Sequence, residues 1–260
     1  IRVTAGKRVH GTGSIPGGMN RHVSLDDRAA LQRDIAQVIA WSEDAVAIAR
    51  QLHTANRALY DSFGAVPSKM LSLVRPDGAL ELYDGVLRAR DEQGAIVLDG
   101  AADQGYRGLI EEDVKPWTYM KFPHLRALGA ESGSYRVGPL ARVQNCDFID
   151  TPRAEAARRA FVAAGGGTPQ HAPLAYHWAR MIEVLHCAEV IERLLDEPAI
   201  LSGELVGHGK RTGHGVGIIE APRGTLIHDY DVGDDDLVTR CNLIVSTTHN
   251  NQAMNEAVRE

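Results

Sequence analysis

The sequence predicts a predominantly helical α+β fold, in which long packed helices surround a small mixed or antiparallel sheet. Two stretches repeat apolar residues at the spacing of an amphipathic helix, and several shorter stretches alternate apolar and polar residues as strands do. The 260 residues are 44% apolar, which is enough for one large core, and no internal repeat divides the chain. We therefore expect residues 1–260 to form a single domain.

The first long helix is expected over Leu25–His53. Ser24 is a helix-capping residue, and Asp26 and Asp27 follow it in the first turn, where carboxylates favour a helix N-terminus. Apolar residues at helical spacing then predict one buried face, made by Leu31, Ile35, Val38, Ala45, Ile48 and Leu52.

A second long helix is expected over Leu174–Leu195, and it should end near Pro198, because proline cannot continue a helix. Its apolar face comprises Leu174, Trp178, Met181, Ile182, Leu185, Ala188, Ile191 and Leu195. A shorter helix is expected over Ala154–Ala164. The two long helices should form the core of the domain.

The strands are expected in three places. Residues 71–99 contain short apolar or alternating runs separated by Pro76-Asp77-Gly78 and Glu92-Gln93-Gly94, which predicts a small antiparallel meander. A short strand is expected in 134–138, and the aromatic segment 111–129 is expected to be a connector packed on the core.

The third place is "VGIIEAPRGTLIHDYDV", residues 216–232, where an Ala-Pro-Arg-Gly turn separates two strand-like segments. Val216, Ile218 and Leu226 occupy the positions that a half-buried strand gives to apolar residues. A third strand is expected over 240–249, and a helix over 251–260. Gly6–Arg21 is rich in glycine and should be an ordered loop.

Composition excludes several classes of function. The net charge of −6 and pI near 6.0 provide no basic surplus for a nucleic-acid partner. No run of apolar residues is long enough for a membrane span, and no secretory signal is visible in residues 1–260. Three distant cysteines, Cys146, Cys187 and Cys241, fit reduced thiols in a cytoplasmic protein better than a disulfide framework.

Familiar catalytic motifs are absent from the sequence. The segment "GHGKRTGHGVG" differs from a phosphate-binding loop, because position 204 is Glu and position 211 is Arg. His171, His177 and His186 are spaced by 6 and 9 residues, so they do not share a helix face as zinc ligands would. No serine occupies a Gly-x-Ser-x-Gly elbow.

Arg223 is the residue that requires an explanation, because it places a permanent charge at a tight turn between two apolar strands. In one interpretation it pairs with a buried carboxylate such as Asp229. In the other, the guanidinium is fixed on the turn to stabilise an anionic group in a cavity that excludes water. The residues alone leave both interpretations open.

Six segments together resemble the large subunit of nickel-iron hydrogenases, within the cytoplasmic bidirectional, NAD-reducing type. They occur in the order of that family: "KRVHGTGSIPGGMN" (7–20), "WTYMKFPHL" (117–125), "YRVGPLARV" (135–143), "HWARMIEVLHCAEV" (177–190), "GIIEAPRGTLIHDY" (217–230) and "NLIVSTTHNNQAMN" (242–255). The resemblance implies an enzyme that cleaves H2 reversibly and heterolytically.

The resemblance also implies roles for individual residues. Arg223 is expected to be the catalytic residue above the metals, with Ala221 and Pro222 shaping the pocket for diatomic ligands. Ser246 and Thr247 are expected at the cofactor, where Thr247 would donate a hydrogen bond to an iron-bound cyanide. In some members the carbonyl at the position of Leu243 serves a distant magnesium or iron. The implied cofactor is a nickel-iron centre with CN and CO on the iron.

The sequence departs from this family in one respect. Its members bind the metals through two Cys-x-x-Cys motifs, and neither occurs between Ile1 and Glu260. We expect residues 1–260 to be an interior segment of a longer subunit, so that they supply groups around the metals and no cysteine ligands. The implied partners are a small subunit with iron-sulfur clusters, flavin-containing diaphorase-type subunits and H2, with NAD or another soluble acceptor.

Two alternatives remain open on sequence grounds. One is the metal-free, hydrogenase-like subunit of NADH-quinone oxidoreductase, which typically has Lys at the place of Arg223 and an acidic residue at the place of Thr225. The other is a non-catalytic structural paralogue. Arg223-Gly224-Thr225 favours the hydrogenase over the first alternative.

Overall fold

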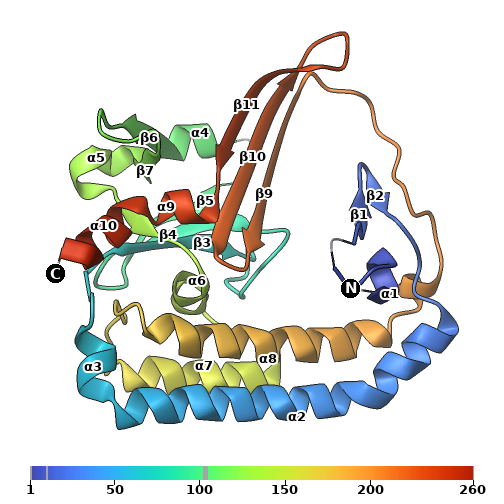
Figure 1. The fold of residues 1–260 in the computed structure, drawn as a ribbon, viewed down its shortest axis with the longest axis horizontal. Coiled ribbons are helices and arrows are strands. Elements are labelled where there is room, and N and C mark those ends of the chain that lie inside the picture. Colours follow the sequence, from blue (N-terminus) through green and yellow to red (C-terminus); the bar gives the residue numbers. More distant parts are fainter. Residues whose placement is uncertain (1, 10, 102–104, 260) are drawn as a thin grey trace.

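The computed structural model describes residues 2–9, 11–101 and 105–259, and its fold is α+β, as predicted (Figure 1). Helices α2 (Leu25–Ala55), α7 (Pro152–Ala164) and α8 (Ala175–Leu195) lie side by side as one layer. The strands lie on one side of this layer, and the β9–β11 sheet projects away from it. Short elements complete the fold: α1 (Arg2–Ala5), β1 (Ser14–Ile15), β2 (Gly18–Met19), α3 (Arg57–Ser62), α4 (Tyr106–Leu109), η2 (Arg126–Leu128), α5 (Gly129–Ser132) and η3 (Pro198–Leu201).

Helix α2 begins where the sequence predicts and ends two residues later than expected. The Ser24 hydroxyl accepts a hydrogen bond from the Asp27 N–H at 3.1 Å, which caps the helix. The predicted buried face is wrong in part, because α2 packs along α8 on one side only and its other apolar side chains have no cover. Ile35, Ile39 and Val46 are buried, whereas Leu31, Val38, Ile48 and Leu52 are exposed.

Helix α8 lies in one of two core clusters, so the prediction that the two long helices form the core holds in part. Trp178, Ile182 and Leu185 are buried, and the ring of Phe161 from α7 meets Trp178 edge-on at a centroid distance of 5.1 Å. Ile191 was expected on the same face, but it is exposed. This cluster draws residues from α2, α6, α7, α8 and β3. A second core cluster lies among the strands and contains no residue of α2 or α8, so the two long helices build one part of the core and not all of it.

The central sheet contains β3 (Lys69–Val74), β4 (Val86–Arg90) and β5 (Ile96–Ala101), which form the predicted antiparallel meander. The expected strand near residue 135 is β8 (Tyr135–Arg136), which pairs parallel with β3. Helix α6 (Pro139–Asn145) follows β8 directly and packs against β3 and α8.

The prediction that 111–129 is a connector packed on the core is wrong. This segment contributes most of an antiparallel hairpin of β6 (Ile110–Val114) and β7 (Lys121–Leu125). Phe122 is buried, but Trp117 and Tyr119 are exposed at the hairpin loop. Pro116, Trp117 and Tyr119 therefore lie at an exposed turn between strands, whereas Phe122 and Pro123 are buried within β7. The expected loop Gly6–Arg21 likewise contains the small β1–β2 pair.

The predicted strand pair around the Ala-Pro-Arg-Gly turn is β9 (His214–Ala221) and β10 (Gly224–Val232), and β11 (Val238–Ile244) is the third strand. Ile218 lies opposite Ile227 in the strand pair, so both side chains point to the buried face of the sheet. Leu226, the neighbour of Ile227, points to the other face and is only partly buried.

The third strand ends earlier than expected, because Ser246–His249 forms the short helix α9, followed by α10 (Asn251–Arg259). The Asn250 side chain accepts a hydrogen bond from the Val137 N–H at 2.8 Å and holds this corner against the preceding segment. Within the described residues, none of the helices combines the length and the apolarity that a membrane span needs.

Candidate functional site

The Ala221–Gly224 turn lies at the end of the β9–β10 hairpin that faces the body of the molecule (Figure 1). Gly224 has a φ of 137°, and a Cβ placed there would lie 2.3 Å from Cγ2 of Val137. Gly138 has a φ of 109°, and a Cβ there would lie 2.8 Å from the carbonyl oxygen of Arg223. The turn and the segment before α6 approach this closely because both positions are glycine.

Three carbonyls of the turn each accept a hydrogen bond from a side chain on a different helix. Arg142 of α6 donates from Nη1 to the Ala221 carbonyl at 3.0 Å. Arg180 of α8 donates from Nη1 to the Pro222 carbonyl at 2.7 Å. Ser246 of α9 donates from Oγ to the Gly224 carbonyl at 2.7 Å. The backbone of the turn is therefore held from three directions.

Arg142 is also the centre of a buried ionic cluster. Its Nε and Nη2 donate to the two carboxylate oxygens of Glu183 at 2.5 and 2.8 Å, and its Nη1 donates to Glu220 at 2.7 Å. The side chains of Arg142, Glu183 and Glu220 are 3%, 10% and 0% exposed. The remaining Glu220 oxygen accepts from the Leu73 N–H at 2.9 Å and from the Thr225 hydroxyl at 2.7 Å.

Charge in this cluster is unevenly balanced, with two carboxylates around one guanidinium. Burial alone would lower the pKa of Arg142, but the hydrogen bonds and charges of Glu183 and Glu220 raise it above its ordinary value. Burial raises the pKa of Glu220, and Arg142 opposes that change. Arg142 is thus a fixed cation, on which both carboxylates depend for compensation.

A cavity of about 510 Å³ lies beside the turn. Its walls are largely apolar, and Arg142, Glu183 and Glu220 form a polar part of its lining next to Ala221 and Pro222. The Arg223 side chain does not line this cavity: it is exposed, and it forms no hydrogen bond or ion pair with any residue that the structure describes. The water-free pocket expected around Arg223 is thus not formed by these residues alone.

Asp229 was one predicted partner for Arg223, and that interpretation is wrong. Asp229 accepts two hydrogen bonds from Arg107, both at 2.7 Å, and one from Arg240 at 3.2 Å. It also binds His214 Nε2 at 3.0 Å and the Tyr106 hydroxyl. These bonds, the Arg107 bond above all, hold the pKa of Asp229 well below its ordinary value. The pattern of strand residues gave no indication of these partners, because Arg107 is distant in sequence.

In the part of the chain that the structure describes, one group of side chains has the spacing of a metal site: His214, Asp229 and Asp231. It lies at the opposite end of the hairpin from the turn, because Asp231 pairs with His214 and Gly224 pairs with Ala221. Arg107 and Arg240 already neutralise its carboxylates, which disfavours a cation there.

The chain's cysteines do not assemble a thiolate site. Cys146 is buried, Cys187 is partly buried and Cys241 is exposed, and none belongs to a group of metal-ligating side chains among the described residues. The residues present therefore do not fit the ligand set of a nickel-iron centre. They fit only as hydrogen-bond donors around such a group.

The other predicted site residues lie around the same corner. Ser246 is buried and bonded to the turn, whereas Thr247, the next residue, is exposed. Leu243 is an exposed residue of β11, paired with His228. Among the predicted site residues outside the turn, Ser246 thus forms a hydrogen bond with the turn, whereas no such bond is found for Thr247 or Leu243 in the part of the chain that the structure describes.

The sequence interpretation missed the residues that hold the turn: Arg142, Arg180, Glu183 and Glu220. One signal was available, because Glu220 lies two residues after Ile218 in a strand and so shares its buried face. A carboxylate at such a position requires a buried donor. Arg142 and Glu183 come from distant helices, and only the tertiary fold shows that they supply and complete this interaction.

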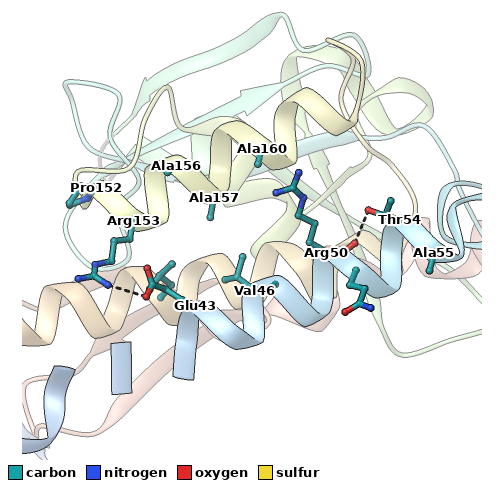
Figure 2. A pocket seen from close by; sticks show the side chains of 13 residues that line it. Glu43, Val46, Arg50, Thr54, Ala55, Pro152, Arg153, Ala156, Ala157 and Ala160 are labelled. Carbon is teal, nitrogen blue, oxygen red and sulfur yellow. Dashed lines mark hydrogen bonds and ion pairs between the residues drawn. The ribbon is translucent and has the colours of Figure 1, made fainter. Parts of the chain in front are cut away.

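A larger groove of about 890 Å³ lies elsewhere, between α2 and α7 (Figure 2). Small side chains such as Ala156 and Ala160 line it, and Arg153 and Glu43 form a 3.0 Å ion pair at its edge. Both partners of that ion pair are about half exposed, and the groove holds none of the predicted site residues. The turn is therefore the better candidate for the site.

Known proteins are similar to this chain along its whole length. No protein-family model matches the chain. Along its whole length the chain is 39% identical to NAD-reducing hydrogenase HoxS subunit beta of Cupriavidus necator, of which it covers 55%. It is 34% identical to one of the subunits of the F420-non-reducing hydrogenase vhu of Methanococcus voltae, of which it covers 61%. The chain thus spans a little over half the length of these relatives.

Solved hydrogenase structures are also similar to this chain. An NAD+-reducing [NiFe]-hydrogenase in the H2-reduced state superposes with a TM-score of 0.94 at 52% identity, over 99% of this chain and 57% of that one. The Ni-Fe-Se hydrogenase of D. vulgaris Hildenborough shares the fold, with a TM-score of 0.74 at 18% identity over 99% of this chain and 60% of that one. Given these likenesses, the chain is homologous along its whole length to the large subunits of nickel-iron hydrogenases.

Proposed function

We propose that this chain is part of the catalytic large subunit of a cytoplasmic hydrogenase that cleaves H2 reversibly and passes the electrons to a soluble acceptor such as NAD. The observation that carries the proposal is the 52% identity, over 99% of the chain, to a structure described as an NAD+-reducing [NiFe]-hydrogenase. The Arg223-Gly224-Thr225 sequence supports it, because the metal-free alternative typically has Lys and an acidic residue at the first and last of these positions.

Residues 1–260 would contribute to such an enzyme without holding the metals. Relatives are nearly twice as long, and no cysteine pair with ligand spacing occurs in the chain. We therefore propose that the thiolate ligands lie elsewhere in a longer subunit. The nickel-iron centre, when bound, supplies the chemistry that separates H2 into a hydride and a proton.

The chain's own part in this chemistry would be to donate hydrogen bonds and exclude water. Arg223 is exposed and unpaired among the described residues, on a turn whose backbone is fixed, so its guanidinium is available to an anionic ligand such as cyanide. Thr247, also exposed, offers a hydroxyl from the neighbouring corner. Ala221 and Pro222 would shape the adjoining wall, and the Leu243 carbonyl is a candidate ligand for a separate magnesium ion.

The proposed partners are supported by the names of these relatives and by the resemblance of the sequence to the hydrogenase family. Both are named as subunits, so we propose a hetero-oligomer in which the chain assembles with an iron-sulfur small subunit, together with flavin-containing subunits. The cytoplasmic location agrees with three cysteines that form no disulfide.

The variant Arg223→Lys in the assembled enzyme tests the role of Arg223. Lysine keeps the charge but loses the planar, two-point donor, so we expect H2 turnover to fall about tenfold or more, which corresponds to about 1.4 kcal/mol in the barrier. Nickel and iron contents should stay near those of the wild type, because Arg223 is not a ligand.

Arg211→Lys is a matched control, because Arg211 is also exposed, but it binds Asp236 in the loop between β10 and β11, away from the turn. Its turnover should be that of the wild type. A fully metallated Arg223→Lys enzyme with undiminished turnover would refute the proposed role. An isolated natural protein with neither nickel nor iron would instead support the structural paralogue.

A further inference from the structure

We propose that Arg142 and Arg180 are positioning residues, which hold the backbone of the Ala221–Gly224 turn so that the free guanidinium of Arg223 is presented from one fixed place. This inference rests on the function proposed above for Arg223. Both arginines would act through the carbonyls of Ala221 and Pro222, to which they donate hydrogen bonds.

The first step of the argument is how completely the turn is specified. The carbonyls of residues 221, 222 and 224 are bound by Arg142, Arg180 and Ser246, and the carbonyl of residue 223 lies where a side chain at Gly138 would be. A short hairpin turn does not need three side-chain donors for its own stability. The donors fix where the turn lies relative to α6, α8 and α9.

The second step is the orientation of Arg142 itself. Glu183 binds both Nε and Nη2, so the guanidinium plane cannot rotate without breaking two charged hydrogen bonds. Nη1 is then shared between Glu220 and the Ala221 carbonyl, on adjacent residues of β9. Glu220 is in turn tied to β3 through the Leu73 N–H and to β10 through Thr225. The cluster thus couples the start of the turn to three elements.

The third step concerns which arginine can be replaced by lysine. The Arg180 guanidinium donates to a single carbonyl of the turn, and a lysine ammonium can supply one donor. Arg142 meets three acceptor groups in a fixed fork, which a lysine cannot reproduce. The two positions should therefore respond differently to the same substitution.

The experiment uses the assembled enzyme and four variants: Arg180→Ala, Arg180→Lys, Arg142→Lys and, as control, Arg193→Ala. Arg193 is an exposed arginine of the same helix as Arg180, and it forms a 3.4 Å ion pair with Asp150, away from the turn. Amide hydrogen exchange is measured in peptides that cover residues 219–226, with peptides of β11 as an internal reference for global unfolding. The kcat and KM for H2 are measured in parallel.

We expect exchange in the turn to rise at least about tenfold relative to β11 in Arg180→Ala and Arg142→Lys, because lost donors free the backbone to open locally. Arg180→Lys and Arg193→Ala should match the wild type. The kcat should fall in the first two variants with little change in KM, because a positioning residue acts through the turn and not by binding H2.

Unchanged turn exchange in Arg180→Ala overturns the proposal, and this variant decides the matter if Arg142→Lys does not fold. The exchange measurement does not depend on turnover, so the two proposals fail separately. If turn exchange rises while Arg223→Lys keeps full turnover, the positioning is supported and the role of Arg223 is refuted.

Discussion

The β9–β10 hairpin carries a buried ionic cluster at each end, and the two clusters differ in where their arginines lie. At the turn, the Arg142 side chain is 3% exposed and has Glu183 and Glu220 around it. At the far end, Asp229 is 0% exposed, but its partners Arg107 and Arg240 are 46% and 42% exposed. The turn thus depends on a cation that water cannot replace, whereas the far end buries a single anion under solvated cations.

This difference indicates what each cluster does. Solvated arginines lose little when a partner is removed, because water compensates their charge. A buried arginine cannot be removed without leaving its carboxylates uncompensated. The buried arginine lies beside the turn that carries Arg223, where we propose that a fixed position matters for function. The cluster at the far end, whose arginines are solvated, links β10 to α4 through Tyr106 and Arg107.

The largest effect is expected from Arg142→Met, which removes the cation between two buried carboxylates. We expect a loss of about 3–5 kcal/mol in the free energy of unfolding, measured by calorimetry on the natural protein. The double variant with Glu183→Gln should recover part of the loss, because one uncompensated charge disappears. A loss below about 1 kcal/mol would mean that the two ends of the hairpin do not differ in the way described.

A smaller effect is expected from Gly224→Ala at the same turn. The residue has a φ of 137°, and the added methyl would meet Val137 and the backbone nitrogen of Gly138. We expect a loss of about 2–4 kcal/mol from strain and overpacking, visible in the thermal midpoint. Gly217→Ala is the matched control, because Gly217 belongs to the same hairpin and has nothing within 4 Å of the added atom. Equal midpoints for both variants would contradict the close approach.

The smallest effect is expected at the far end, from Asp229→Asn. We expect a loss of about 1–2 kcal/mol near pH 7, because the charged hydrogen bonds weaken while Arg107 and Arg240 stay solvated. The pKa of Asp229 is lowered in the fold, so its contribution to stability is present above about pH 4 and is lost as the pH falls below that value.

The pH profile checks this assignment. Wild-type stability should fall more steeply than that of Asp229→Asn as the pH is lowered from about 4 to 2. Asp234→Asn is the control, because that carboxylate is fully exposed in the loop between β10 and β11. Parallel profiles for wild type and Asp229→Asn would show that another carboxylate dominates acid unfolding.

The sequence alone determines the two long helices and the β9–β10 turn, because these depend on interactions between residues that are close along the chain. Helical spacing and the Ser24 cap gave α2 and α8 within two residues, and glycine with proline marked the β9–β10 turn. The tertiary structure decided which sides of α2 are covered and which donors reach Glu220, Asp229 and the turn carbonyls. Periodicity reports that a face is apolar or that a charge is out of place, but Arg142 and Glu183 meet Glu220 only because distant helices pack on one hairpin.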